Sequence, residues 1–109
     1  MENMKIEGHI WMDTSTGLKI GKGRAMLLEL IDHTGSIAEA ARIAEIPYRR
    51  AWGMIREMNK NASSLLVIKS VGGREGGGSV LTDEGKKILS TFQKIDRDFE
   101  QFKKSNIYD

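Results

Sequence analysis

The segment 35–59 constrains the fold of this chain most strongly, because it contains two short helical patterns separated by the chain's single proline. Pro47 disfavours helical geometry at Ile46, so the sequence Glu45-Ile46-Pro47 is expected to break the first helix. The same proline can open the second helix, since a residue in the first turn needs no N–H donor. Two short helices joined by a tight turn are typical of a helix-turn-helix, whose second helix enters the DNA major groove.

The first helix of this segment has a start signal and an apolar face. Gly35 suits the left-handed position that ends a preceding helix, expected at residues 24–33. Ser36 can cap the next helix, and Glu39 three residues later completes a Ser-x-x-Glu capping box. The apolar face recurs at three- and four-residue spacing and is formed by Ile37, Ala40, Ala41 and Ala44.

The second helix, expected at residues 47–60, separates an apolar side from a basic side. The apolar side is formed by Tyr48, Ala51, Trp52, Ile55 and Met58. The other side carries Arg49, Arg50, Gly53, Arg56, Glu57 and Lys60. A row of arginines on a helix is often only a solvated face. Here it follows a capped helix and a proline turn, which favours contact with DNA.

Composition fits a single small domain. The chain has 109 residues, of which 39% are hydrophobic, so it can bury one core. Its net charge is only +2, but residues 36–82 hold seven of the 17 basic and four of the 15 acidic residues. Residues 36–82 therefore have a net charge of +3, and the rest of the chain, with ten basic and eleven acidic residues, has a net charge of −1. The positive excess lies where phosphate attraction requires it.

Short strands are expected on both sides of the helix-turn-helix. Residues 4–13 alternate between apolar and polar, and after a turn at 14–17 residues 18–20 could form a return strand. Downstream, residues 65–70 and 80–81 are expected to pair across a loop at 72–79, as in the wing of a winged helix. Five glycines among residues 72–78 leave the loop N–H groups accessible to a phosphate, with Arg74 as the loop's cation. The alternative is a plain surface turn.

A long last helix is expected from the Thr82 cap to about Ser105. Its apolar residues follow a four-three heptad pattern. The residues on this pattern are Leu81, Ile88, Phe92, Ile95, Phe99 and Phe102, with Gly85 completing the series. A lone winged helix has little core for so long a helix, so we expect residues 88–102 to form a dimer interface with a second copy. The alternative is that the helix folds back over its own domain.

Residue chemistry argues against an enzyme, and no catalytic, metal or cofactor site is expected. The chain has no cysteine, and His9 and His33 are its only histidines, so no metal or nucleophile–base set can be assembled. Gly73–Gly78 has P-loop spacing, but Ser79-Val80 stands where Lys-Ser or Lys-Thr is required.

The longest aliphatic run, 65–68, is too short to span a membrane, and no secretory signal is present. Cytoplasm is the expected location.

The quoted segments resemble a known family. GSIAEAARIAEIPYRRAW and IREMN, followed by LLVIKSVGGREGGGSVLTDEGKKIL, resemble the N-terminal DNA-binding domain of ModE-type, molybdate-responsive regulators. The resemblance extends from about Gly23 to Leu89, and the helix-turn-helix is also similar, more loosely, to LysR-type regulators. It implies a winged helix, a homodimer and operator binding. It also implies recognition residues at positions 48–50 and a basic wing tip at Arg74.

These observations together predict a mainly α protein with a little β. We expect one winged-helix domain over residues 1–109, with N-terminal strands at 1–21, the core at 23–82 and a C-terminal helix at 83–105. The expected function is sequence-specific binding of double-stranded DNA as a homodimer, with no membrane association. The expected DNA contacts are Ser36, Tyr48, Arg49, Arg50, Arg56, Lys60 and Arg74.

Two alternatives to DNA binding stay open: a protein-interaction module that uses the winged-helix surface, and an oxyanion or nucleotide binder that uses the glycine-rich loop. The longer regulators sense molybdate through a separate C-terminal β-domain. The chain ends at Asp109 without such a segment, so no molybdate binding is expected in this chain.

Overall fold

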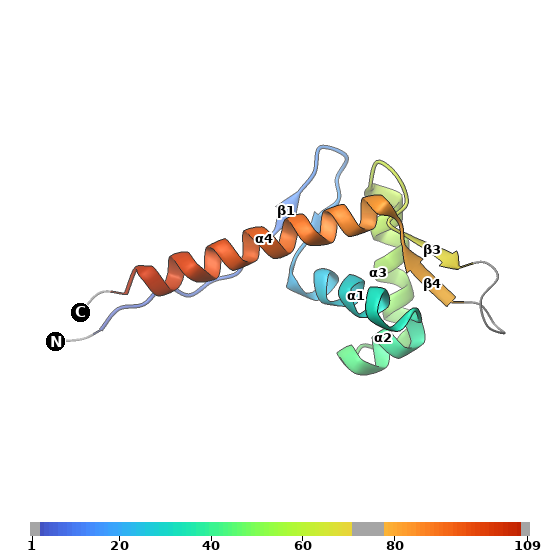
Figure 1. Cartoon of the computed structure of the whole chain (residues 1–109), viewed down its shortest axis with the longest axis horizontal. Helices are drawn as coiled ribbons and strands as arrows, with labels where there is room; N and C mark the ends of the chain where they lie inside the picture. Colours follow the sequence, from blue (N-terminus) through green and yellow to red (C-terminus); the bar gives the residue numbers. More distant parts are fainter. Residues whose placement is uncertain (1–2, 71–77, 108–109) are drawn as a thin grey trace.

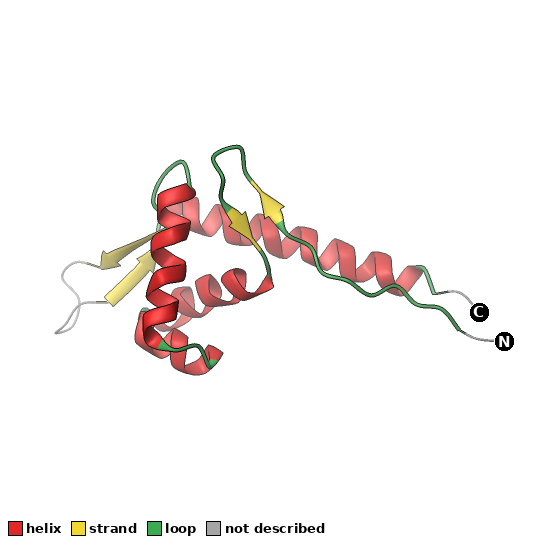
Figure 2. Cartoon of the chain, turned by 180° about the vertical axis from the view of Figure 1, so that it is seen from behind, coloured by secondary structure: helices red, strands yellow, loops and turns green. Residues whose placement is uncertain are grey.

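The computed structural model describes residues 3–70 and 78–107. The elements in chain order are β1 (Met12–Asp13), β2 (Lys19–Ile20), α1 (Lys22–Thr34), α2 (Ile37–Ala44), α3 (Tyr48–Asn61), β3 (Val67–Ser70), β4 (Gly78–Leu81) and α4 (Asp83–Ser105). Within the described ranges the strands form two antiparallel pairs, β1 with β2 and β3 with β4. The fold is a mainly helical winged helix-turn-helix, as the sequence predicted (Figures 1 and 2).

Helices α1, α2 and α3 pack around a core that the first half of α4 and the base of the β3–β4 hairpin complete. Ala40 and Ala41 of α2 are almost fully buried, which lets this helix lie close to α1 and α3, whereas Ala44 of the predicted apolar face is only half-buried. The largest fully buried side chains of the core are Leu18, Ile20, Leu27, Leu28, Ile31, Met58 and Leu66. The register of the hairpin places Val67 opposite Leu81, and both are buried against the helices.

The corner between α1 and α2 forms as predicted, with one correction. Gly35 has φ 69 and its N–H donates to the Ile31 carbonyl at 2.8 Å. The Ser36 hydroxyl accepts from the Glu39 N–H at 3.1 Å, which confirms the cap. The return half of the capping box is wrong: the Glu39 carboxylate pairs with Arg42 at 2.8 Å. The Ser36 N–H instead donates to the Thr34 hydroxyl at 3.2 Å, so its donor is already satisfied.

The turn between α2 and α3 is formed by Glu45, Ile46 and Pro47, the segment that was expected to break the helix. Glu45 has φ 58, a left-handed conformation that few non-glycine residues adopt. It ends α2, and the N–H of Ile46 donates to the Ala41 carbonyl at 2.9 Å. Pro47 then stands just before α3, whose first helical residue is Tyr48. The proline still separates the two helices, as the sequence predicted.

The predicted strand over residues 4–13 is wrong in most of its length. Within it, only Met12 and Asp13 form a strand, which pairs with Ile20 and Lys19 respectively, and Met4 makes an isolated bridge. Residues 5–11 run extended along the outer half of α4 without a strand partner among the described residues (Figures 1 and 2). The apolar side chains of this segment pack on the surface of α4 instead of forming one face of a sheet. Ile6 and Ile10 are half-buried, while the residues next to them are exposed.

Helix α4 has the predicted bounds and an N-cap at Thr82, whose hydroxyl accepts from the Gly85 N–H at 3.0 Å. Its first half packs on the core, where Leu89 and Phe92 are buried. Its second half projects from the helical core as an arm (Figure 1). Phe92 thus lies in the chain's own core and Phe99 packs beside Gly8, whereas Ile95 and Phe102 remain 41% and 52% exposed.

Candidate nucleic-acid interface

Helix α3 presents a basic stripe to solvent. Arg49, Gly53, Arg56 and Lys60 follow one another at four- and three-residue spacing, which places them on one side of the helix. The three charged members are exposed. The opposite side, with Ala51, Ile55 and Met58, is buried in the core. The core therefore fixes the orientation of α3 and leaves the stripe outward.

The cations of this surface are not neutralised within the described chain. Arg49, Arg50, Arg56, Lys60 and the nearby Lys69 have no carboxylate within ion-pair distance among the residues that the structure describes. An incoming phosphate would therefore break no existing ion pair at these side chains.

Arginines on neighbouring faces differ in this respect. Arg24 pairs with Glu57 on the flank of α3, and Arg42 pairs with Glu39 on α2. The hydrogen bond and the charge of Arg42 hold the pKa of the exposed Glu39 carboxyl below its ordinary value, and the pKa of Arg42 is raised in return. These two ion pairs neutralise Arg24 and Arg42. The positive charge of this surface therefore comes mainly from the α3 stripe and the cations beside it.

Tyr48 is exposed, although the apolar side of α3 to which it belongs is otherwise buried or half-buried. Its ring is 52% exposed and meets Trp52 edge-on, with the ring centroids 6.3 Å apart. Tyr48 is the first residue of the helix and lies beyond the edge of the core, so the buried side begins at Ala51. The exposure leaves the Tyr48 ring and hydroxyl available at the end of α3 that carries Arg49 and Arg50.

The remaining predicted contacts lie around α3. Ser36 is half-buried at the start of α2, where its hydroxyl oxygen is occupied by the cap. A hydroxyl that accepts one hydrogen bond can still donate another, so the cap does not prevent a phosphate contact. Arg74 and most of the loop 72–79 lie outside the residues that the structure describes.

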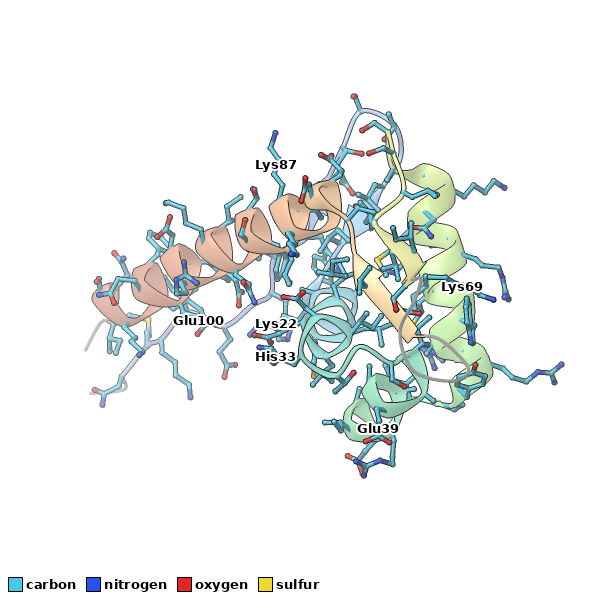
Figure 3. The ribbon with its side chains drawn as sticks, turned by 45° about the vertical axis from the view of Figure 1, so that its right-hand side comes forward. Lys22, His33, Glu39, Lys69, Lys87 and Glu100 are labelled. Atoms are coloured by element: carbon cyan, nitrogen blue, oxygen red, sulfur yellow. The ribbon has the colours of Figure 1, made fainter. Side chains whose placement is uncertain are left out.

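Sequence reasoning missed two residues of this surface. Asn59 fastens strand β3 to α3: its Oδ1 accepts from the Leu66 N–H at 2.8 Å and its Nδ2 donates to the Val67 carbonyl at 3.0 Å. Lys69 lies on β3 beside α3, exposed and unpaired within the described chain (Figure 3). The signal for Lys69 was its place in a predicted wing strand. For Asn59 no local signal existed, because its partners lie in the next element.

Residues 3–70 and 78–107 hold no group of three or more His, Asp or Glu side chains arranged for a metal ion. His33 lies in the last turn of α1, as expected for a side chain that favours the negative end of a helix. Within the same described residues, no helix has both the length and the apolar character needed to cross a membrane.

The fold and the outward basic helix together define a protein of the winged helix-turn-helix class. No protein-family model matches the chain. It is 37% identical over 89 residues to the molybdenum transport protein ModE of Azotobacter vinelandii, covering 82% of this chain and 33% of that protein. It is 41% identical over 72 residues to the DNA-binding transcriptional dual regulator ModE of Escherichia coli, covering 66% of this chain and 28% of the regulator.

A third relative carries a different name. The molybdenum-pterin-binding protein MopB of Rhodobacter capsulatus is 38% identical over 81 residues, covering 74% of this chain and 30% of MopB. The predicted relationship to ModE-type proteins is thus confirmed over most of the chain. The matched region spans about a third of the length of these curated relatives, and none of the three names describes an enzyme.

Proposed function

We propose that this chain is a cytoplasmic, non-enzymatic regulator of transcription that binds operator DNA as a homodimer. Helix α3 lies in the major groove and the loop 72–79 contacts the backbone. The observation that carries the proposal is the exposed stripe of cations on the second helix of a helix-turn-helix, none of which has an acidic partner among the described residues. The names of the ModE relatives, which include transcriptional regulators, support the same role.

Different positions on α3 perform different parts of the binding. Arg49 and Arg50 lie in the first turn, the end of a recognition helix that meets base edges. An arginine can donate two hydrogen bonds to guanine O6 and N7, which selects the base. Arg56 and Lys60 lie further along the helix, where phosphate contacts fix the register of the protein without reading sequence.

The homodimer is proposed from the arm of α4. Ile95 and Phe102 are exposed there at heptad spacing, and a second arm would cover them. A two-fold symmetric pair of α3 helices requires a pseudo-palindromic operator, with half-sites one helical turn or a multiple of it apart.

Selection of bound sites from random duplex DNA tests the proposal, followed by affinity measurements at several salt concentrations. We expect one enriched pseudo-palindrome and a steep, log-linear fall of affinity with salt, because phosphate contacts release counterions. A protein-interaction module would enrich no sequence. Failure to enrich any site, with no salt-dependent binding to duplex DNA, would refute the proposal.

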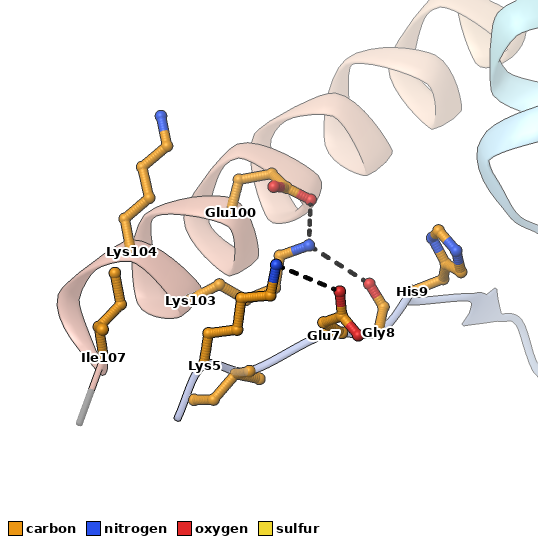
Figure 4. A pocket seen from close by; sticks show the side chains of 9 residues that line it. Lys5, Glu7, Gly8, His9, Glu100, Lys103, Lys104 and Ile107 are labelled. Carbon is orange, nitrogen blue, oxygen red and sulfur yellow. Dashed lines mark hydrogen bonds and ion pairs between the residues drawn. The ribbon is translucent and has the colours of Figure 1, made fainter. Parts of the chain in front are cut away.

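The relatives' names raise the question of molybdenum, and we propose that this chain does not bind molybdate. An open cavity of about 550 Å³ lies between residues 5–9 and the end of α4 (Figure 4). Two of its lysines are already paired, Lys5 with Glu7 at 3.7 Å and Lys103 with Glu100 at 2.8 Å. The two carboxylates would repel a dianion, so the cavity is a poor oxyanion site.

Calorimetry with the purified 109-residue chain tests this expectation. We expect no heat of binding with molybdate or tungstate beyond that of sulfate at equal ionic strength, and no change in DNA affinity. A stoichiometric isotherm at micromolar molybdate would contradict the proposal and would favour the oxyanion-binding alternative.

A further inference from the structure

A narrow groove separates the recognition helix from the first strand of the wing hairpin. Its volume is about 160 Å³, and its walls come from α3 on one side and β3 on the other. Trp52 and Ile55 contribute an apolar floor, and Arg56 and Lys69 line the groove from opposite walls. None of the described residues that line it is acidic.

The two walls are held at a fixed spacing. The three hydrogen bonds of Asn59 to Leu66 and Val67 fasten the start of β3 to the last turns of α3. On the other side of the hairpin, the Ser79 N–H donates to the Gly35 carbonyl at 2.9 Å. The hairpin is therefore joined to both α3 and the α1–α2 corner, and the groove exists before any ligand arrives.

The charge of the groove identifies the chemistry of its ligand. Arg56 and Lys69 are both exposed and have no acidic partner in the described chain. Glu57, the nearest acid along α3, is paired with Arg24. Two cations from separate elements, facing one groove without a carboxylate, suit a group with a single negative charge and several acceptor oxygens. A phosphodiester has these properties.

The position of the groove identifies the source of that group. Arg56 belongs to the α3 stripe that includes Arg49 and Lys60, so a duplex that receives α3 in its major groove brings a backbone past Arg56. Strand β3 lies beside α3, and residues of both elements line the groove. The backbone that borders the major groove therefore passes between the two elements.

We propose that Arg56 and Lys69 together hold one backbone phosphate of the bound duplex in this groove. The proposal rests on the proposed DNA-binding function and adds Lys69 to its contacts. Asn59 contributes indirectly, because its hydrogen bonds set the distance between the walls that carry the two cations.

The first test removes the charge of Lys69 and compares a matched site. Lys69→Gln keeps much of the side-chain length. Lys87→Gln makes the same change at an exposed lysine in the first half of α4 that has no ion-pair partner among the described residues (Figure 3). Affinity is measured for the selected operator and for an unrelated duplex over a range of salt. We expect Lys69→Gln to weaken both duplexes by a similar factor and to reduce the salt slope by about one. Lys87→Gln should leave the affinity and the slope unchanged.

The second test asks whether the two cations share one phosphate. Arg56→Gln, Lys69→Gln and the double variant form a cycle of affinities, with unchanged melting temperatures as the folding control. We expect the double variant to lose at least about twofold less affinity than the product of the single losses, because contacting groups couple. Strict multiplicativity would overturn the shared phosphate.

The outcomes separate the two proposals. Wild-type binding to duplex DNA with Lys69→Gln indistinguishable from wild type would overturn the phosphate site and leave the DNA-binding function intact. A wild-type chain that binds no duplex would overturn the DNA-binding function and the site with it.

Discussion

At the scale of single residues, two helical glycines have opposite surroundings. Gly53 lies in the middle of the α3 stripe, and apart from its chain neighbours and the backbone of α3 itself, no heavy atom of the described residues lies within 4 Å of the place where a Cβ would stand. Gly85 lies in the first turn of α4, where a Cβ would stand 2.2 Å from the Leu66 carbonyl oxygen. Packing within the chain therefore requires glycine at 85 and not at 53.

Alanine at these two positions should change stability in opposite directions. Gly53→Ala should raise the free energy of unfolding by about 1 kcal/mol, because alanine favours a helix interior over glycine. Gly85→Ala should lower it by about 1–3 kcal/mol, since the added methyl overpacks against rigid backbone. Urea denaturation measures both values. A destabilised Gly53→Ala variant would contradict the open space beside Gly53. A neutral Gly85→Ala variant would contradict the close contact between Gly85 and the Leu66 carbonyl.

The arginines of α3 should separate into base-reading and phosphate-binding residues. Arg50→Ala should relax specificity at one operator position, where a bidentate contact to guanine is worth roughly 1–3 kcal/mol of discrimination. Arg56→Ala should weaken all duplexes alike. Affinities for operators with single base changes measure the difference. If Arg49→Ala and Arg50→Ala both lower the affinity equally for every operator sequence, the assignment of these arginines to base reading is wrong.

At the scale of elements, ion pairs join the arm of α4 to its neighbours. The Glu100 carboxylate lies 3.6 Å from the Lys22 amine at the start of α1 and 2.8 Å from the Lys103 amine. Lys103 also donates to the Gly8 carbonyl at 3.4 Å and lies 5.2 Å from the centre of the Phe99 ring. Glu100 thus links α4 to α1 directly. Through Lys103 it also links α4 to residues 5–11, which we call the N-terminal segment.

This cluster should make stability fall in acid. The hydrogen bond from Lys103, with the charges of Lys103 and Lys22, holds the pKa of Glu100 below its ordinary value of 4.5, against a smaller opposing effect of burial. Because the pKa is lower in the folded chain, the stabilisation is present above pH 4.5 and is lost as pH falls through the folded pKa. Glu100→Gln should therefore be less stable than wild type near neutral pH and equal to it in strong acid.

Urea titrations of wild type and Glu100→Gln across the acid range measure that difference, and an NMR titration of the Glu100 carboxyl gives its midpoint. A midpoint at or above the ordinary value would contradict the proposed pairing. Lys94–Asp98 is the control pair, because it joins two residues of α4 alone and should not affect the N-terminal segment.

At the scale of the whole molecule, the chain consists of a helical head and a projecting arm, with overall extents of 61 × 30 × 20 Å. The head carries the basic stripe of α3, and the arm carries Ile95 and Phe102 in exposed positions (Figure 1). The N-terminal segment covers Phe99 but leaves Phe102 uncovered. This arrangement suits a symmetric pair of arms that holds two heads toward one duplex.

A charge on the exposed part of the arm should separate the proposed dimer. Phe102→Asp should give monomers that bind operator DNA weakly, because an aspartate would have to be buried between the two arms. Gln101→Asp adds the same charge at the adjacent exposed position and should remain dimeric. Light scattering at micromolar concentration measures both states, and a monomeric wild type would refute the interface.

The sequence alone determined the elements whose signals lie within a few residues. Gly35, Ser36 and Thr82 form their turns and caps as predicted, since the groups they satisfy are adjacent in the chain. The helix-turn-helix and the bounds of α4 followed from the same short-range signals together with helical periodicity. The resemblance to ModE-type proteins added the expected DNA-binding role.

Only the tertiary structure decided which distant residues meet. The alternating N-terminal segment lies along α4 rather than in a sheet, and Tyr48 lies outside the core. Arg56 and Lys69 line one groove because Asn59 bonds to the backbone of the next element. Periodicity specifies which face of a segment is apolar, but not which surface covers it. That choice depends on the packing of the whole chain, which places partners that no local pattern identifies.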